Sequence, residues 1–372
     1  EFSTKSLPLV LGRRADNEGV IEDLARIPHL LIAGTTGSGK SQFVISFITS
    51  LLFRHTPETL RMILIDPKQV DLSSFKDVPH LLSPPIVSVG ETISALRWAI
   101  AEMEKRYRSL AQFGVRDLNS FNKIAGKLSI REQKEHEEWN RKSTGSDDYY
   151  YQNLPQICLI IEEFGDLMTD PQFKRSIEMC VVRLAQKARA SGIHLVLAMQ
   201  SPRKDVITGL IKTNIPGRIS FKVASGTDSR VILDEVGAER LLSHGDMLFL
   251  QPGASKPLRF HGPFISEEDV SRVVNYWKEL GEPEYISDLR ENKAKSQNFS
   301  GDFSDSEESD PMYEEILNYV QTCSSISASF LQRKFRIGYP RAARLIEILY
   351  EEGVIGPPQG SKPREVLTAA DK

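Results

Sequence analysis

The run at residues 34–41 has the spacing of a phosphate-binding loop, G-x-x-x-x-G-K-[ST]. Its glycines let the backbone turn N–H groups towards phosphate oxygens, and a helix that starts there adds a favourable dipole. In this pattern Lys40 reaches the β- and γ-phosphates, while the Ser41 hydroxyl holds Mg²⁺. We therefore expect an ATP–Mg²⁺ site. Its binding residues would be Gly34, Thr35, Thr36, Gly37, Ser38, Gly39, Lys40, Ser41 and Gln42.

A phosphate loop works with a carboxylate at a strand end, which holds Mg²⁺ through water and polarises the attacking water. The apolar run at residues 157–161 ends in two acids, and we assign Glu162 to the Mg²⁺ position and Glu163 to the base. Asp66, which follows the apolar run at residues 62–65, is a rival for the metal. Gln200 follows another such run and is expected to orient water or sense the γ-phosphate; capping its own loop is the alternative.

Short apolar runs alternate with helical stretches around these residues, which favours a mainly parallel sheet covered on both faces. The predicted strands are residues 30–33, 62–65, 157–161 and 193–198, and the predicted helices are residues 40–53, 92–110 and 173–190. The fold class is therefore α/β. Residues 1–28 read as short strands ahead of this core, and the polar residues 131–152 as an excursion or mobile loop.

The last quarter of the chain, from about residue 281, changes character. An acidic, Ser-rich segment within residues 281–310 cannot bury enough apolar surface to fold, so we predict a flexible linker there. Residues 311–372 carry three short helical stretches and a small hairpin, the outline of a winged helix. The expected organisation is a motor domain at 1–280, a linker at 281–310 and a winged-helix domain at 311–372.

Two groups of basic residues are candidates for DNA contact. The first lies at the end of the second tail helix and on the third, where such folds enter the major groove. It consists of Arg333, Lys334, Arg336, Arg341 and Arg344, with a solvated face of a protein-binding domain as the alternative. The second group follows the strand at residues 193–198 and would face a pore. It consists of Arg203, Lys204 and Lys212.

Composition sets the outer limits. The 372 residues carry a net charge of −3, so the chain is no polycation and any nucleic-acid footprint must be local. Three cysteines without metal spacing favour a reduced, cytoplasmic compartment and suggest no zinc site. No apolar run approaches the roughly 20 residues of a membrane span, so this chain is expected to make no membrane contact. Because it lacks an initiator Met, we expect a missing N-terminal part that could tether it to the inner membrane.

Taken together, the motifs closely resemble the FtsK/SpoIIIE family of DNA translocases. The matching segments are residues 28–41, 65–68, 104–107, 183–190, 192–195, 205–212, 245–248, 336–339 and 341–344. The resemblance covers nearly the whole chain, apart from the linker and residues 131–152. It implies a RecA-like P-loop motor that forms a homo-hexameric ring around double-stranded DNA. It also implies a winged helix that reads short oriented sequences and a role in chromosome segregation at cell division, with site-specific recombinases or division proteins as further partners.

Ring motors complete each site with an arginine from the neighbouring subunit. By its place in the family's motif, Arg189 is the candidate, and Arg183, Arg218 and Arg230 are its rivals.

The chain departs from the family's pattern at three places. The family usually has Asp where this chain has Glu162, which puts the efficiency of hydrolysis in doubt. After Gln200 the basic residue is displaced to Arg203, and Pro340 replaces an Asn at the start of the recognition helix. Which DNA sequence is read is therefore open.

The function predicted from these residues is ATP hydrolysis coupled to DNA translocation. A secretion- or conjugation-type ATPase that pumps another polymer is the main alternative. A P-loop kinase would explain the phosphate loop, but not the acidic linker and the basic winged helix. A transcription regulator that uses ATP as a switch would need nucleotide binding without steady DNA-dependent turnover.

Overall fold

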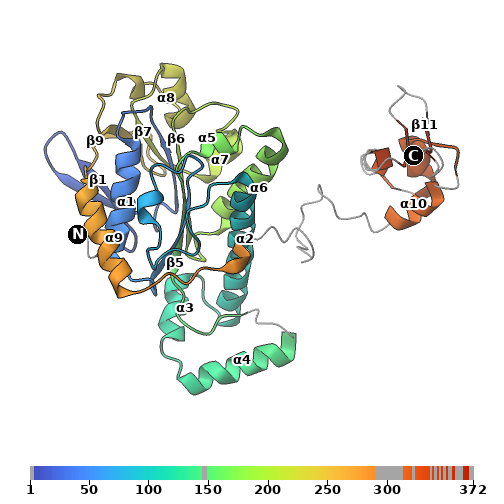
Figure 1. The fold of residues 1–372 in the computed structure, drawn as a ribbon, viewed down its shortest axis with the longest axis horizontal. Coiled ribbons are helices and arrows are strands. Elements are labelled where there is room, and N and C mark those ends of the chain that lie inside the picture. The colour runs from blue at the N-terminus through green and yellow to red at the C-terminus, as the bar shows by residue number, and fades with distance from the viewer. Residues whose placement is uncertain are drawn as a thin grey trace. The chain divides into compact units, whose positions relative to one another are not determined.

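Two compact units make up the chain, Glu1–Ser296 and Gln297–Lys372 (Figure 1). The computed structural model describes residues 4–144, 149–289, 313–320, 323–335, 337–338, 342, 345–346, 349–350, 354–356 and 363–367. From residue 290 onward, the linker expected at residues 281–310 lies outside the described residues.

Within the described part of the first unit, nine strands form one sheet in the order β2-β1-β9-β8-β7-β3-β6-β5-β4. The strands are β1 (Pro8–Arg13), β2 (Gly19–Asp23), β3 (His29–Ala33), β4 (Leu60–Ile65), β5 (Gln156–Ile161), β6 (Ile193–Met199), β7 (Gly217–Phe221), β8 (Asp246–Leu250) and β9 (Leu258–His261). The neighbours from β7 to β4 pair in parallel, and the remaining pairs are antiparallel. The predicted mainly parallel α/β core is confirmed. It continues into an antiparallel half, in which β1 and β2 fall within the short strands expected at residues 1–28, whereas β8 and β9 were not predicted.

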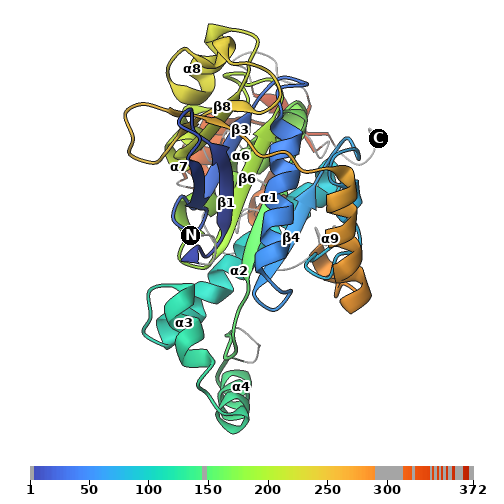
Figure 2. The ribbon, with the colours of Figure 1, turned by 90° about the vertical axis from the view of Figure 1, so that its left-hand side faces the viewer.

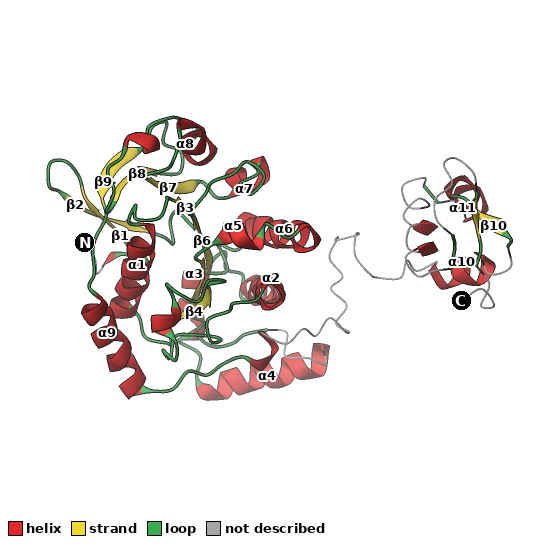
Figure 3. Ribbon diagram, turned by 45° about the horizontal axis from the view of Figure 1, so that its top comes forward, coloured by secondary structure: helices red, strands yellow, loops and turns green. Residues whose placement is uncertain are grey.

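Helices cover both faces of this sheet (Figure 3). They are α1 (Lys40–Arg54), α2 (Val89–Gln112), α3 (Leu118–Ala125), α4 (Ile130–Thr144), α5 (Phe164–Leu167), α6 (Pro171–Lys187), α7 (Gly209–Asn214), α8 (Gly226–Leu233) and α9 (Glu267–Leu280). Alternate residues of a strand point to opposite faces. Leu30 and Ile32 therefore join a core with α1 and α9, whereas Leu31 joins a core with α2 and α6.

Residues 131–152 were expected to form an excursion or mobile loop, and most of the segment is a helix and not a loop. Helix α4 spans Ile130–Thr144, and Figures 1 and 2 show it with α3 at one end of the unit. Ion pairs one turn apart join Arg131 to Glu135 and Glu138 to Lys142. A helix held by such charge pairs has no apolar stripe for a periodicity analysis to detect.

The outer edge of the sheet at β4 is covered by the chain segment at residues 80–86. Met62 donates its N–H to the carbonyl of His80 and accepts from Leu82, at 2.8 and 2.9 Å. The carbonyl of Ile86 accepts from Asp66 at 2.8 Å. The backbone groups at this edge are therefore satisfied within the chain.

The second unit contains α10 (Tyr313–Val320), β10 (Ser325–Ile326), α11 (Ala328–Phe335) and β11 (Arg364–Glu365). Strands β10 and β11 pair in antiparallel fashion, and an isolated bridge joins Ile355 to Val366. Apolar side chains from α10, α11 and the stretch at residues 342–349 share one buried core. This arrangement confirms the small winged-helix domain, although its third helix is described only in part.

No helix among the described residues is both long and apolar enough to cross a membrane.

Candidate nucleotide-binding site

The phosphate loop joins β3 to α1, as the motif predicts. Gly37 and Gly39 have φ of 76° and 104°, in the left-handed region that favours glycine. A Cβ on Gly39 would lie 2.5 Å from the amide nitrogen of Gly245, so only glycine permits this approach. Gly245 donates to the carbonyl of Ser38 at 2.9 Å, and Thr35 donates to the carbonyl of Lys222 at 2.9 Å. Neighbouring loops thus fix the loop's shape from outside.

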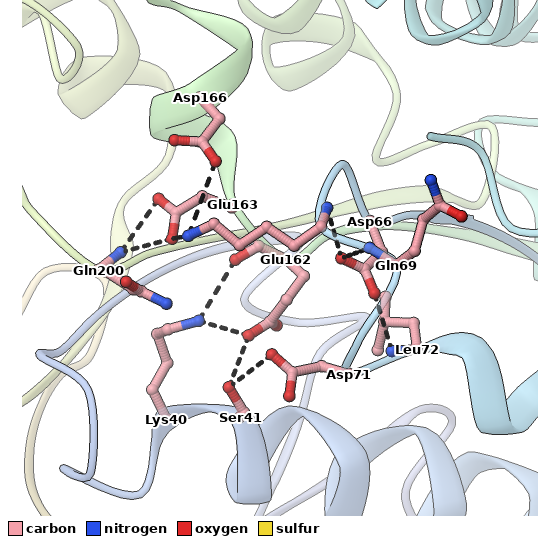
Figure 4. A network of polar contacts seen from close by, with 11 residues as sticks. Lys40, Ser41, Asp66, Gln69, Asp71, Leu72, Glu162, Glu163, Asp166 and Gln200 are labelled. Atoms are coloured by element: carbon pink, nitrogen blue, oxygen red, sulfur yellow. Dashed lines mark hydrogen bonds and ion pairs between the residues drawn. The ribbon is translucent and has the colours of Figure 1, made fainter. Parts of the chain in front are cut away.

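Lys40 and Ser41 both contact Glu162, which follows the end of β5 (Figure 4). The Nζ atom of Lys40 lies 2.5 Å from Oε1 of Glu162, and the Ser41 hydroxyl donates to the same oxygen at 2.8 Å. Lys40 and Glu162 are each about 3% exposed. Burial raises the pKa of Glu162, while Lys40 and Ser41 oppose that shift. The strand order therefore brings the predicted phosphate and metal residues into contact.

These side chains fit a magnesium–nucleotide. Among the described residues, Oε2 of Glu162 and the buried Ser38 hydroxyl have no hydrogen-bond partner. No cluster of three or more His, Cys, Asp or Glu in the described part of the chain could hold a metal by itself. Mg²⁺ is usually bound by one or two carboxylates together with phosphate and water oxygens. Ser41 and Glu162 offer oxygen atoms for Mg²⁺, and Lys40 offers a positive charge for the phosphates.

Glu163 lies beside this group and faces the end of β6. Its two carboxylate oxygens both accept the backbone N–H of Gln200, each at 3.2 Å. Nζ of Lys68 lies 3.4 Å from the Oε2 oxygen. Glu163 is 5% exposed. The base candidate and the water-orienting candidate are thus joined directly, with the Gln200 side chain close by (Figure 4).

Asp66, the rival for the metal, is committed to its own loop. Its carboxylate accepts the backbone N–H groups of Lys68, Gln69 and Leu72, each at 3.1 Å. A carboxylate that bonds three nearby N–H groups fixes a turn. We therefore interpret Asp66 as the residue that closes the loop at residues 66–72.

This loop brings two further residues, Lys68 and Asp71, to the site that the sequence analysis did not assign. Asp71 accepts a hydrogen bond from the Ser41 hydroxyl at 3.0 Å. Lys68 lies between Glu163 and Asp166, 3.6 Å from the latter. The sequence signal for this loop was the segment at residues 65–68, which is one of the segments that match the family's motifs. Because β4 and β5 are parallel neighbours, their carboxyl ends meet at one edge of the sheet.

The four arginine candidates lie on different parts of the first unit. Arg189 is exposed between α6 and the start of β6, so it lies at the opposite edge of the sheet from the phosphate loop. Arg183 is ion-paired with Glu104, and Arg218 with Asp234. The fourth candidate, exposed on α8, is Arg230.

The DNA candidates of the first unit lie after β6. Arg203 and Lys204 are exposed, and Arg203 lies 3.7 Å from Asp205. The Nζ atom of Lys212 donates to Asp234 at 2.6 Å, so this lysine has an acidic partner within the chain.

In the second unit, the exposed Arg333 and Lys334 lie in the last turn of α11. Lys334 carries its Nζ atom 4.8 Å from the ring centre of Tyr319. The other three basic candidates, Arg336, Arg341 and Arg344, lie outside the described residues.

Two family models match the sequence. The FtsK/SpoIIIE family matches residues 1–204, and the Ftsk gamma domain matches residues 307–369. The chain is 44% identical over 380 residues to the DNA translocase FtsK of Pseudomonas aeruginosa, covering 98% of this chain and 46% of that protein. It is 46% identical over 369 residues to DNA translocase FtsK 2 of Neisseria meningitidis, covering 99% and 36%. The chain thus spans less than half the length of these relatives.

Solved structures show the same fold. The pCW3 conjugation coupling protein TcpA superposes with a TM-score of 0.58 at 24% identity, covering 75% of this chain and 72% of that one.

Proposed function

Because the chain belongs to the FtsK/SpoIIIE family, we propose that it is an ATP-driven motor that moves along double-stranded DNA. The observation that carries the proposal is the buried contact of Lys40 and Ser41 with Glu162, with Glu163 next in the chain. Such a group serves phosphoryl transfer to water, in which the protein positions the reactants and stabilises charge. The relatives' own description as DNA translocases supports the choice of track.

Each residue then has a defined task when magnesium–ATP, which supplies the γ-phosphoryl group, is bound. Lys40 would bind the β- and γ-phosphates, and Ser41 and Glu162 would hold Mg²⁺. Glu163 would accept the proton of the attacking water, and Gln200 would orient that water. Loss of a general base typically lowers turnover by about 10²–10⁴-fold.

The remaining contribution would come from a neighbouring copy in a homo-hexameric ring. Arg189 lies at the opposite edge of the sheet from its own phosphate loop, so it is unsuited to its own site. An arginine from a neighbouring subunit stabilises charge that develops on the γ-phosphate. We therefore include Arg189 of a neighbouring copy in the proposed site.

DNA contact would involve both units. In the first, Arg203, Lys204 and Lys212 would grip the phosphate backbone within the ring. In the second, the winged helix would read oriented sequences. Its contacts would come from Arg333, Lys334, Arg336, Arg341 and Arg344. The proposed role of the whole protein is chromosome segregation in the cytoplasm at cell division, with site-specific recombinases or division proteins as further partners.

The test is steady-state ATP hydrolysis with and without long linear duplex DNA. We expect strong stimulation by duplex DNA, and its loss in Lys40→Ala and in Glu163→Gln. Glu163→Gln should still bind a fluorescent ATP analogue, because that change removes the base and keeps the phosphate loop. Displacement of a DNA triplex would then report movement. Hydrolysis that is indifferent to DNA would contradict the proposal and favour a pump for another polymer.

A further inference from the structure

We propose that Lys68 is a latch on Glu163: in the resting motor its ammonium group restrains this carboxylate, and hydrolysis requires that the contact opens. The inference rests on the proposed function, because it gives Glu163 the role of base. It assigns a positioning role to a residue that would touch neither nucleotide nor water.

The contacts of Glu163 carry the argument. The Nζ atom of Lys68 lies 3.4 Å from Oε2 of Glu163. The backbone N–H of Gln200 donates to both carboxylate oxygens of Glu163, each at 3.2 Å. A general base must lie within hydrogen-bond reach of the proton that it accepts. In this state both oxygens of the Glu163 carboxylate are therefore held, by Lys68 and by the Gln200 N–H.

Lys68 has a second partner that makes release possible. Its Nζ atom lies 3.6 Å from Oδ2 of Asp166, which is half exposed. The Lys68 side chain is itself 43% exposed. The ammonium can therefore move from Glu163 towards Asp166 and solvent without losing every charged partner. Burial alone would lower the pKa of Lys68, but Glu163 and Asp166 raise it, so the latch stays charged at neutral pH.

The same loop also contacts the other half of the site. Lys68 and Asp71 are three residues apart, and Asp71 accepts the hydrogen bond of Ser41, the proposed Mg²⁺ residue. Asp66 fixes the start of this loop through its hydrogen bonds, while Val70 in the middle of the loop is 70% exposed. A change at Ser41 on nucleotide loading would therefore act on a short, pinned segment that also carries the latch.

The latch can be distinguished from a merely structural role by the sign of one measurement. If Lys68 held Glu163 in its productive position, its removal would lower hydrolysis in every condition. If Lys68 restrains Glu163, removal raises the rate in the absence of DNA, when the restraint operates. The DNA-stimulated rate should change little, because there the base is already engaged.

The experiment compares Lys68→Gln and Lys68→Met with Lys68→Arg, which keeps the charge. We expect kcat without DNA to rise roughly two- to fivefold in the first two, the range for a partly exposed ion pair, and to stay low in Lys68→Arg. The affinity for a fluorescent ATP analogue should stay within about twofold, since phosphate binding is unaffected. Lys76→Gln, which removes an exposed lysine nearby in sequence, controls for loss of charge and should behave as wild type.

An unchanged or lower kcat without DNA in both Lys68→Gln and Lys68→Met would overturn the latch. A rise that Lys76→Gln reproduces, or that Lys68→Arg shares in full, would overturn it as well. The proposed function fails differently: the wild-type protein would then show no stimulation by DNA. The rates with and without DNA are measured in the same assay for the wild-type protein and for the variants, so the two failures are distinguishable.

Discussion

Replacing Asp66 by alanine should destabilise the first unit without removing either of the proposed Mg²⁺ residues, Ser41 and Glu162. The carboxylate is 1% exposed and accepts three backbone N–H groups. The N–H of Leu72 is buried, so its loss of a charged partner costs about 1.5–3 kcal/mol. Water can partly replace the other two bonds, at about 0.5–1 kcal/mol each. We therefore expect the free energy of unfolding to fall by about 2.5–5 kcal/mol.

Asp66→Asn should cost less, for a reason visible in the contacts. Oδ1 accepts from both Lys68 and Gln69, and an asparagine oxygen can keep those two bonds. The amide nitrogen would instead meet the N–H of Leu72, where two donors cannot bond. About half of the alanine effect is expected.

Urea denaturation followed by tryptophan fluorescence measures this effect. The chain's three tryptophans, Trp98, Trp139 and Trp277, all lie in the first unit, so the signal reports that unit. Glu58→Gln, which removes an exposed carboxylate, serves as the control for lost charge. Suppose instead that Asp66→Asn kept wild-type stability and lost Mg²⁺-dependent nucleotide binding. Asp66 would then be a metal residue, and the assignment to the loop would be wrong.

Two further predictions concern pH and the phosphate loop. Burial lowers the pKa of His29, His80 and His194 from 6.5 to about 3, about 4 and about 4. These histidines are buried in their neutral form, so their contribution to folding stability is present above pH 6.5 and is lost as the pH falls towards 4. Urea titrations should therefore give a lower free energy of unfolding near pH 5 than near pH 7.5. Equal values would contradict this prediction. Gly39→Ala combines a positive φ with a clash at Gly245, so we expect at least about tenfold weaker binding of a fluorescent ATP analogue. Gly37→Ala is the matched control, since its added Cβ meets no described atom within 4 Å; equal losses would show that the clash is irrelevant.

Much of the nucleotide site could be predicted because its signals are local. The spacing of the phosphate loop names Lys40 and Ser41, and the buried strand before Glu162 and Glu163 is readable as an apolar run. That the two segments meet follows from parallel strands, whose carboxyl ends share one edge of the sheet. The motif and the apolar periodicity together therefore predicted that Lys40 and Ser41 lie near Glu162.

Other contacts depend on the path of a loop, which periodicity does not encode. Lys68 and Asp71 reach the site only because Asp66 turns the backbone after β4. Asp66 itself was a rival to Glu162 for the metal, since sequence cannot tell whether a carboxylate faces an ion or its own backbone. Strands β8 and β9 escaped notice because they are short, and three of the four β9 residues are exposed.

The covered edge at β4 also bears on solubility. An open strand edge can template pairing with another chain, which is how sheets aggregate. Here the segment at residues 80–86 occupies the hydrogen-bonding groups of Met62 and Leu64 that a foreign strand would need. Copies brought close together, as in the proposed ring, can therefore touch through side chains without their sheets merging at this edge. The copies would then remain separate subunits even when several of them bind the same DNA.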